Sequence, residues 1–201
     1  MANLSSGEIG HFYFPGTARY SSKVPIPIET PRLLLRAWRP SDREPFASMN
    51  ADPRVMEFFP ACLTRAESDG LVERIEANMR RDGYSFFAAE LRQTGEFIGF
   101  IGISVPPFDF MPFDEIGWRL AADYWNQGLA TEGARAVLRF AFDELGRDEV
   151  VAFTSTINLR SRRVMEKLGM THDARDDFDH PRVAEGHPLR RHVLYRIHRE
   201  C

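Results

Sequence analysis

The sequence predicts a single domain of the α/β (α+β) class over residues 29–201, preceded by an extension of residues 1–28. Three observations predict this class: two helical patterns come early, β-rich runs follow, and strand and helix patterns alternate toward the end of the chain. The extension is rich in Ser, Gly and Pro and shows neither periodicity. A chain of 201 residues that is 43% hydrophobic can bury one sizeable core.

The domain is expected to begin with a strand and a short helix. The run RLLLRAW at residues 32–38 suits a strand. Ser41 and Glu44 form a capping-box pattern, which predicts a helix that continues through Met49.

A second, longer helix and a hairpin follow. Thr64 and Glu67 repeat the capping-box pattern, and apolar residues at helical spacing predict a helix that Gly83 ends. The β-rich runs at 84–91 and 97–105 are separated by RQTGE, whose glycine is typical of a hairpin turn.

The rest of the domain alternates strand and helix. Residues 116–120 suit another strand, and apolar side chains form one stripe on a helix that begins near Gly128 and ends at Gly146. A strand over 150–156, a helix over 158–168 and a strand over 192–197 complete the pattern.

Composition excludes several classes of protein. The net charge of -3 gives no broad attraction to nucleic acid or to acidic membranes and mildly favours cationic substrates. The two cysteines, Cys62 and Cys201, fit neither a disulfide framework nor the spacing of metal ligands, so a reducing cytoplasm is expected. No segment has the roughly 20 apolar residues that span a bilayer.

The segment DEIGWRLAADYWNQGLATEGA, residues 114–134, predicts an anion site, because a strand pattern leads through a glycine turn into a helix. The first N–H groups of a helix have no internal partner, so residues 127–131 offer a row of donors. The Lys-Ser/Thr pair of a P-loop is missing, which argues against magnesium-assisted phosphoryl transfer. A diphosphate held without a metal fits this turn.

Three stretches, EIGWRL, YWNQGLATEGA and TINLRSRRVMEKLGM, resemble the GNAT superfamily of N-acetyltransferases from about residue 29 to the C-terminus. The form W-x-Q-G-x-A-T-E over residues 125–132 is most similar to the branch that acetylates N-terminal amines of ribosomal proteins. Trp125 stands where Gln or Arg is usual in the broader pattern. The resemblance implies the GNAT fold, a mixed and mostly antiparallel sheet with a splayed strand pair, and acetyl-CoA as co-substrate without a metal.

The resemblance also implies which residues bind the cofactor. The strand residues would pair with the pantetheine amides as an added strand does, and the helix start would hold the diphosphate. Asn158 and Ser161 share a helix face with Met165, where many relatives carry Tyr. Asn158 would reach the pantetheine arm. The full set is Trp118, Arg119, Leu120, Gln127, Gly128, Leu129, Ala130, Thr131, Asn158 and Ser161.

Two residues are candidates for proton transfer. Glu115, at the head of the central strand, is the leading candidate to accept the amine proton through a water, while its neighbour Asp114 points to the opposite face. The alternative is a solvated strand-end carboxylate. Met165 cannot donate a proton, so either Ser161 protonates the departing sulfur or it leaves as thiolate, whose reference pKa is about 8.5.

The segment 173–192 is expected to be a loop that joins the last two strands and shapes the acceptor pocket. It holds four aspartates near three histidines, but their spacing does not fit a metal site. We expect a carboxylate-rich rim that attracts a cationic acceptor. The aspartates are Asp173, Asp176, Asp177 and Asp179.

Three functions are consistent with these patterns. The first is acetyl-CoA-dependent N-acetylation of a primary amine, either a protein N-terminus or a small molecule, by a cytoplasmic monomer or homodimer. The second is a coenzyme A-binding module without catalysis, which the missing Tyr at Met165 favours. The third is nucleic-acid binding through RSRR and PLRRH, against which net acidity and the lack of interleaved aromatics argue.

Overall fold

The computed structural model describes residues 27–106, 108, 111 and 113–199, which form a nine-stranded mixed sheet covered by helices on both faces. Its strand order is β1-β2-β3-β4-β5-β6-β9-β7, with β8 also paired to β9. The strands are β1 Ile28–Glu29, β2 Leu33–Arg36, β3 Phe86–Leu91, β4 Phe97–Ser104, β5 Asp114–Leu120, β6 Glu149–Ser155, β7 Thr171–His172, β8 Phe178–Asp179 and β9 Arg191–His198. Among the described strands only β5 and β6 pair in parallel, so the predicted mostly antiparallel sheet is confirmed.

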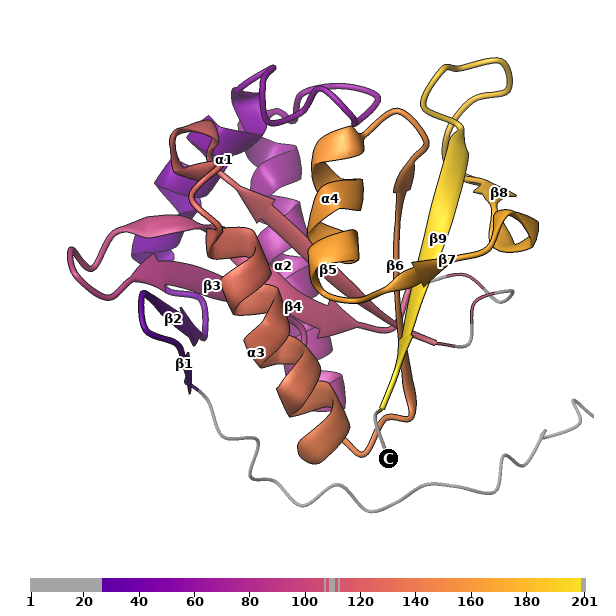
Figure 1. Ribbon diagram of the computed structural model, residues 1–201. Helices are drawn as coiled ribbons and strands as arrows, with labels where there is room; N and C mark the ends of the chain where they lie inside the picture. Colours follow the sequence, from indigo (N-terminus) through magenta and orange to yellow (C-terminus); the bar gives the residue numbers. More distant parts are fainter. Residues whose placement is uncertain (1–26, 107, 109–110, 112, 200–201) are drawn as a thin grey trace, which may run out of the picture.

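Helices cover the two faces of the sheet in pairs (Figure 1). We call the side of α3 and α4 the front face and the side of α1 and α2 the back face. In the view of Figure 1, α4 lies in front of the place where β5 and β6 diverge. The helices are α1 Arg43–Ala51, α2 Arg65–Asp82, α3 Leu129–Asp143 and α4 Leu159–Lys167, with 3-10 turns at Pro40–Asp42, Ala122–Tyr124 and Ala174–Asp176.

The core lies mainly between the sheet and α3. The expected apolar stripe of α3 is buried there, with Ala134, Val137 and Ala141 fully enclosed. A smaller cluster packs α1 and α2 against the back face around Phe46 and Phe100. Together these clusters hold the strands of the central sheet in fixed positions, which gives the site a rigid base.

Two capping predictions have different outcomes. The capping box of Thr64 and Glu67 forms at the start of α2, and Gly83 ends that helix with a φ of 81°. The predicted box of Ser41 and Glu44 is wrong: α1 begins after a 3-10 turn, and its N-cap residue is Asp42. The Asp42 carboxylate is instead held by Arg36 at 2.7 Å, so an ion pair displaces the capping pattern.

Two segments, 173–192 and 1–28, differ in detail from the sequence expectation. Within the segment 173–192, expected to be a loop, the structure adds a 3-10 turn and the short strand β8, because Phe178 and Asp179 pair with β9. The expected extension, residues 1–28, lies outside the described residues apart from 27 and 28, and Ile28 already belongs to β1. No helix in the described part of the chain is both long and apolar enough to cross a bilayer.

Candidate functional site

The parallel strands β5 and β6 separate soon after they meet. They pair only at their N-terminal ends, and the last pair is Glu115 opposite Val151. Beyond it, β5 stays bonded to β4 through Leu120, while β6 stays bonded to β9 through Ser155. The β6-facing backbone of residues 116–120 therefore has no strand partner among the described residues. Such an open edge accepts an extended chain through main-chain hydrogen bonds.

The turn before α3 presents a row of free backbone donors beside this opening. Asn126 and Gly128 have φ values of 59° and 79°, which bend the chain sharply before α3 begins at Leu129. The first intrahelical bond is made by the N–H of Glu132, to the carbonyl of Gly128 at 2.9 Å. The N–H groups of residues 128–131 find no acceptor in the described part of the chain. Because the helix dipole adds to these free donors, the arrangement is suited to binding an anion.

A cluster of polar contacts holds this turn in place. The Glu132 carboxylate accepts hydrogen bonds from Thr30 Oγ1 at 2.6 Å and from Arg32 Nε at 2.6 Å, and Arg32 Nη1 donates to the carbonyl of Gln127 at 2.9 Å. Burial opposes ionisation of Glu132, but these bonds outweigh it and lower its pKa. Sequence reasoning gave Glu132 no role. The structure shows that it ties the start of α3 to the β1–β2 turn.

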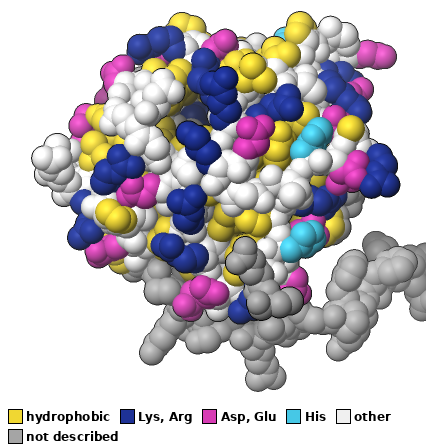
Figure 2. All heavy atoms as spheres, viewed as in Figure 1, with side chains coloured by type: hydrophobic (Ala, Val, Ile, Leu, Met, Phe, Trp, Pro, Cys, Tyr) yellow, Lys and Arg dark blue, Asp and Glu magenta, His cyan; other side chains and the backbone are white. Residues whose placement is uncertain are grey.

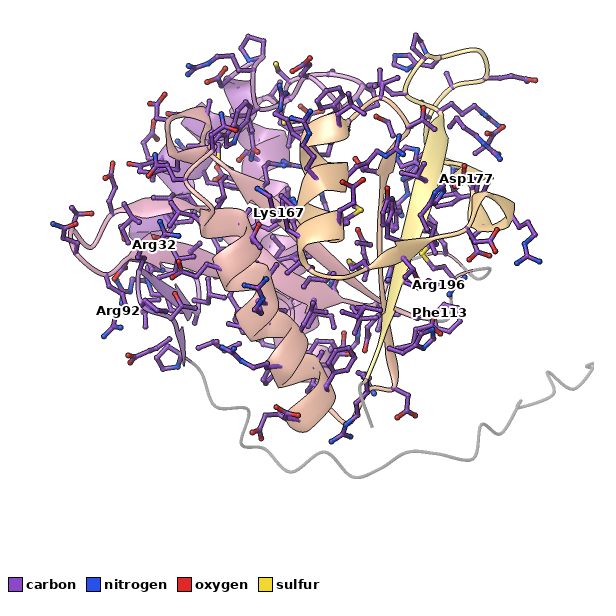
Figure 3. All side chains as sticks on the ribbon, viewed as in Figure 1. Arg32, Arg92, Phe113, Lys167, Asp177 and Arg196 are labelled. Carbon is purple, nitrogen blue, oxygen red and sulfur yellow. The ribbon has the colours of Figure 1, made fainter. Side chains whose placement is uncertain are left out.

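Basic side chains surround the start of α3. A hollow of about 440 Å³ beside Gly128 is lined by Arg32, Arg135, Arg139 and Lys167. Lys and Arg side chains run in a row across this face of the molecule, which is hollowed between them (Figure 2). Arg32 and Lys167 lie on either side of the start of α3 (Figure 3). The positive charge adds to the attraction of the free N–H groups for an anion.

The strand opening leads into a cavity of about 650 Å³ that collects nearly all of the predicted site residues. Gln127 is the exception: it does not line the cavity, and its side-chain amide donates to the carbonyl of Asp123 at 3.0 Å. Predicted residues on the cavity wall are Glu115, Trp118, Arg119, Leu120, Gly128, Leu129, Ala130, Thr131, Asn158 and Ser161.

Asn158 and Ser161 meet the cavity at the start of α4. The Asn158 Oδ1 accepts a hydrogen bond from the backbone N–H of Ser161 at 3.1 Å, which makes Asn158 the N-cap of the helix. Its Nδ2 donates to Thr154 Oγ1 at 2.9 Å. The Ser161 hydroxyl makes no side-chain hydrogen bond in the described structure and lies on the cavity wall beside Met165.

Side chains of β5 alternate between the two faces of the sheet. Arg119 contacts Asn50 of α1, so Glu115, Gly117 and Arg119 belong to the back face. A Cβ at Gly117 would lie only 3.0 Å from the ring of Phe86. The absence of a side chain at Gly117 therefore lets the ring of Phe86 pack close to the backbone of β5.

Glu115 lies where β5 and β6 begin to separate. Its carboxyl group faces the cavity, and burial raises its pKa to about 8. Asp114 has a different role, because it is buried on the opposite face and accepts hydrogen bonds from Tyr84 Oη at 2.9 Å and from Arg147 Nε. The expected orientation of the two neighbours to opposite faces is confirmed, and the role of Glu115 as a base stays a prediction.

Two histidines on the far wall of the cavity were missed by sequence reasoning. His180 and His192 lie with their ring centroids 4.8 Å apart, next to Phe153. Burial, the neighbouring His192 and Arg182 lower the pKa of His180 to about 4, and burial lowers that of His192. Both rings are therefore neutral near pH 7. His192 reaches the cavity wall because β9 pairs with β6, and local sequence patterns do not predict which strands pair.

The aspartates of the expected rim are neutralised locally. Three of them pair with arginines, Asp177 contacts His172, and none lines the cavity. The cavity wall instead carries several arginines and one carboxylate, Glu115, which argues against a carboxylate-rich rim. The pairs are Asp173 with Arg175, Asp176 with Arg196, Asp177 with His172, and Asp179 with Arg190 and Arg191.

Comparisons with known proteins agree with this geometry. Residues 32–171 match the model of the acetyltransferase (GNAT) domain family. The chain is similar to the Bacillus subtilis (strain 168) protein YkkB, with 32% identity over 70% of this chain and 83% of that protein. An acetyltransferase from Agrobacterium tumefaciens str. C58 is similar in structure, with a TM-score of 0.72, 28% identity and coverage of 96% of this chain and 100% of that chain.

A ribosomal α-N-protein acetyltransferase solved in complex with coenzyme A has the same fold, with a TM-score of 0.68. Its sequence is 16% identical, and the match covers 86% of this chain and 97% of that chain. At this level of identity the likeness shows the fold alone.

Proposed function

This chain belongs to the GNAT acetyltransferase family, and we propose that it moves an acetyl group from acetyl-CoA to a primary amine by direct attack in a ternary complex. The family makes the protein an acyltransferase. The acceptor, the roles of individual residues and the order of events are the proposed part.

The single observation that carries the proposal is the strand opening joined to the donor row. An extended arm can bond to the free edge at residues 116–120 while its diphosphate lies on the N–H groups of residues 128–131. Lys167 and Arg135 stand beside that row and suit a molecule with several phosphates. When bound, acetyl-CoA supplies the acetyl group as a thioester.

Glu115 is the proposed base. An ammonium bound beside it favours the carboxylate form of Glu115, and the carboxylate then takes the proton, directly or through a water, so that a neutral amine can attack. An α-amine has a reference pKa of about 7.7 to 8.0, close to the raised pKa of Glu115, whereas a lysine side chain near 10.4 gives up its proton less readily. The pKa match favours α-amines and other weakly basic amines.

Ser161 is the proposed donor to the departing sulfur. Its hydroxyl faces the cavity at the start of α4, where the helix dipole also favours a developing negative charge. Met165, with 1% of its surface exposed, cannot fill this role because it has no proton to give. Where Ser161 does not donate, the sulfur leaves as a thiolate stabilised by the same helix start.

We propose two kinds of acceptor, a protein N-terminus and a small-molecule amine. The W-x-Q-G-x-A-T-E form of the turn supports the first. The cavity volume of about 650 Å³, part of which the cofactor arm would occupy, supports a short terminus or a small molecule over a folded surface.

The test is thiol release from acetyl-CoA in the presence of a panel of amines, followed by mass spectrometry of the products. We expect release above the amine-free rate for at least one acceptor, with a mass gain of one acetyl group on that acceptor. Binding of acetyl-CoA without acceptor-dependent release would favour the non-catalytic module. No binding at all would refute the proposal.

A further inference from the structure

The back face of the cavity contains a half-buried arginine, Arg119, without an acidic partner in the described part of the chain. The Arg119 guanidinium lies over the rings of Phe59 and Phe100, at 4.2 and 5.5 Å from their centroids. Its Nη1 donates to the side-chain oxygen of Asn50 at 2.7 Å. No carboxylate in the described part of the chain lies within ion-pair distance of it.

Arg36, a buried arginine of the same sheet, shows how a guanidinium with a structural role is held in this protein. Arg36 is held by Asp42 at 2.7 Å and by Glu90 at 2.7 Å, so two carboxylates neutralise it. Buried charges are rarely left without such partners. At Arg119 an amide and two aromatic faces take their place, and burial lowers the pKa of the guanidinium to about 10. It still carries its full charge near neutral pH.

The contacts of Arg119 fix the direction in which it points. Asn50 is fully buried and donates to Ser68 Oγ at 2.9 Å, so its oxygen faces the guanidinium. Nη1 is thereby anchored. Nε is buried and has no partner, whereas Nη2 also makes no hydrogen bond but is not closed off from the cavity. Nη2 can therefore donate to an oxygen of a carboxylate in the cavity, and such a charge-assisted hydrogen bond is stronger than a neutral one.

Glu115 and Arg119 lie four residues apart on the same face of β5, and both line the cavity. At a rise of about 3.4 Å per residue, their Cα atoms are about 13 Å apart. An acceptor therefore has to cover the part of this distance that the two side chains do not reach themselves. Its amine end would meet the carboxyl group and its acidic end the guanidinium.

We propose that the Arg119 guanidinium binds a carboxylate of the acceptor, so that the preferred acceptors are amines that also carry an acidic group. This inference rests on the proposed acetyl transfer. The carboxylate belongs either to a small amino acid or to an acidic side chain or terminus of a short peptide, since both present the same two oxygens. Arg119 then selects the acceptor and holds it with the amine near the strand opening.

Matched acceptors that differ in one charge provide the test. The small-molecule arm compares β-alanine and 6-aminohexanoate with their amides. The peptide arm compares Ala-Asp-Gly and Ala-Asn-Gly, both with amidated C-termini. For each pair, kcat/KM is measured by thiol release. We expect the acid to exceed its neutral partner by about 10- to 100-fold in at least one arm, as a charge-assisted hydrogen bond would give.

Three variants assign this preference to a residue. Arg119→Met keeps the side-chain length without the charge, and Asn50→Asp gives the guanidinium an internal carboxylate of the same shape as the asparagine. Both should reduce the acid-to-neutral ratio to near one. Arg182→Met, which removes an exposed charge at the cavity rim, should leave the ratio unchanged. Because the readout is a ratio within one variant, a general loss of activity does not imitate the effect.

Two results would overturn the inference while leaving acetyl transfer intact: turnover of amines without preference for the acid, or a preference that survives in both Arg119→Met and Asn50→Asp. A purely structural role of Arg119 predicts the second outcome for Asn50→Asp, because the added carboxylate then stabilises the fold and changes no ratio. Failure of every amine to give turnover would instead count against the proposed function.

Discussion

Replacing Glu115 with glutamine tests the environment of the proposed base. Burial raises the pKa of this carboxyl group from 4.5 to about 8. At about 1.36 kcal/mol for each pH unit, ionised Glu115 is less favourable in the folded protein than in the unfolded chain by about 3 to 5 kcal/mol. Folded protein thus holds this proton more tightly than unfolded chain does.

The sign of the pH dependence follows from this difference. Because the pKa is raised on folding, Glu115 lowers the free energy of unfolding as pH rises from about 4.5 to about 8, and the loss is complete above 8. Glu115→Gln has no such group. The variant should match the natural protein near pH 5 and become more stable than it by about 3 to 5 kcal/mol at pH 8.5.

Urea unfolding of both proteins at pH 5.0, 6.5 and 8.5 measures this difference. Glu73→Gln is the control for the same substitution at a side chain that is 69% exposed, and it should not reproduce the gain in stability at pH 8.5. In the same series, kcat/KM of the natural protein should rise with pH toward 8, and Glu115→Gln should lose about 10²-fold or more and flatten the profile. A difference in the free energy of unfolding between Glu115→Gln and the natural protein that is the same at all three pH values would refute the reasoning.

Three further results are expected. Gly128→Ala forces a side chain into a φ of 79°, which costs about 1–2 kcal/mol, and should weaken acetyl-CoA binding about 5- to 30-fold by calorimetry. The control Gly146→Ala, at a φ of 64° beyond α3, should lower stability to a similar extent and leave acetyl-CoA binding unchanged. Equal effects of the two variants on binding would contradict the site. Ser161→Ala should lower kcat by roughly 10- to 100-fold with the same acetyl-CoA affinity, and an unchanged kcat would assign thiolate departure to the helix start alone. Asp114→Asn should lower the free energy of unfolding by about 1–3 kcal/mol in urea, because it removes the acceptor of Tyr84 and Arg147, and a neutral outcome would remove its structural role.

Local patterns predicted most of the fold because each signal has a local cause. The hairpin glycine Gly95 does adopt a positive φ of 72°, and the Thr64 cap and the Gly83 stop form as expected. The stripe of α3 is buried as its periodicity required. Ser41 failed as a cap because a tertiary ion pair, between Arg36 and Asp42, sets the geometry of that turn instead.

The candidate site was predictable where it rests on backbone geometry and unpredictable where it rests on distant pairing. The row of N–H groups at residues 128–131 follows from a glycine at a helix start. The presence of His192 on the wall, and the isolation of Arg119 beside Asn50, depend on contacts between segments far apart in the chain. No spacing in the sequence reports such contacts.

The central claim is that backbone amides at the start of α3 and along the open edge of β5 bind acetyl-CoA through hydrogen bonds. Backbone amide NMR of the isotope-labelled protein during an acetyl-CoA titration tests it most directly. The largest shifts are expected for residues 128–131 and 116–120, with the β3–β4 hairpin at residues 92–96 unmoved. Saturable binding that leaves both sets of signals in place, or no binding by the folded protein, would contradict the account.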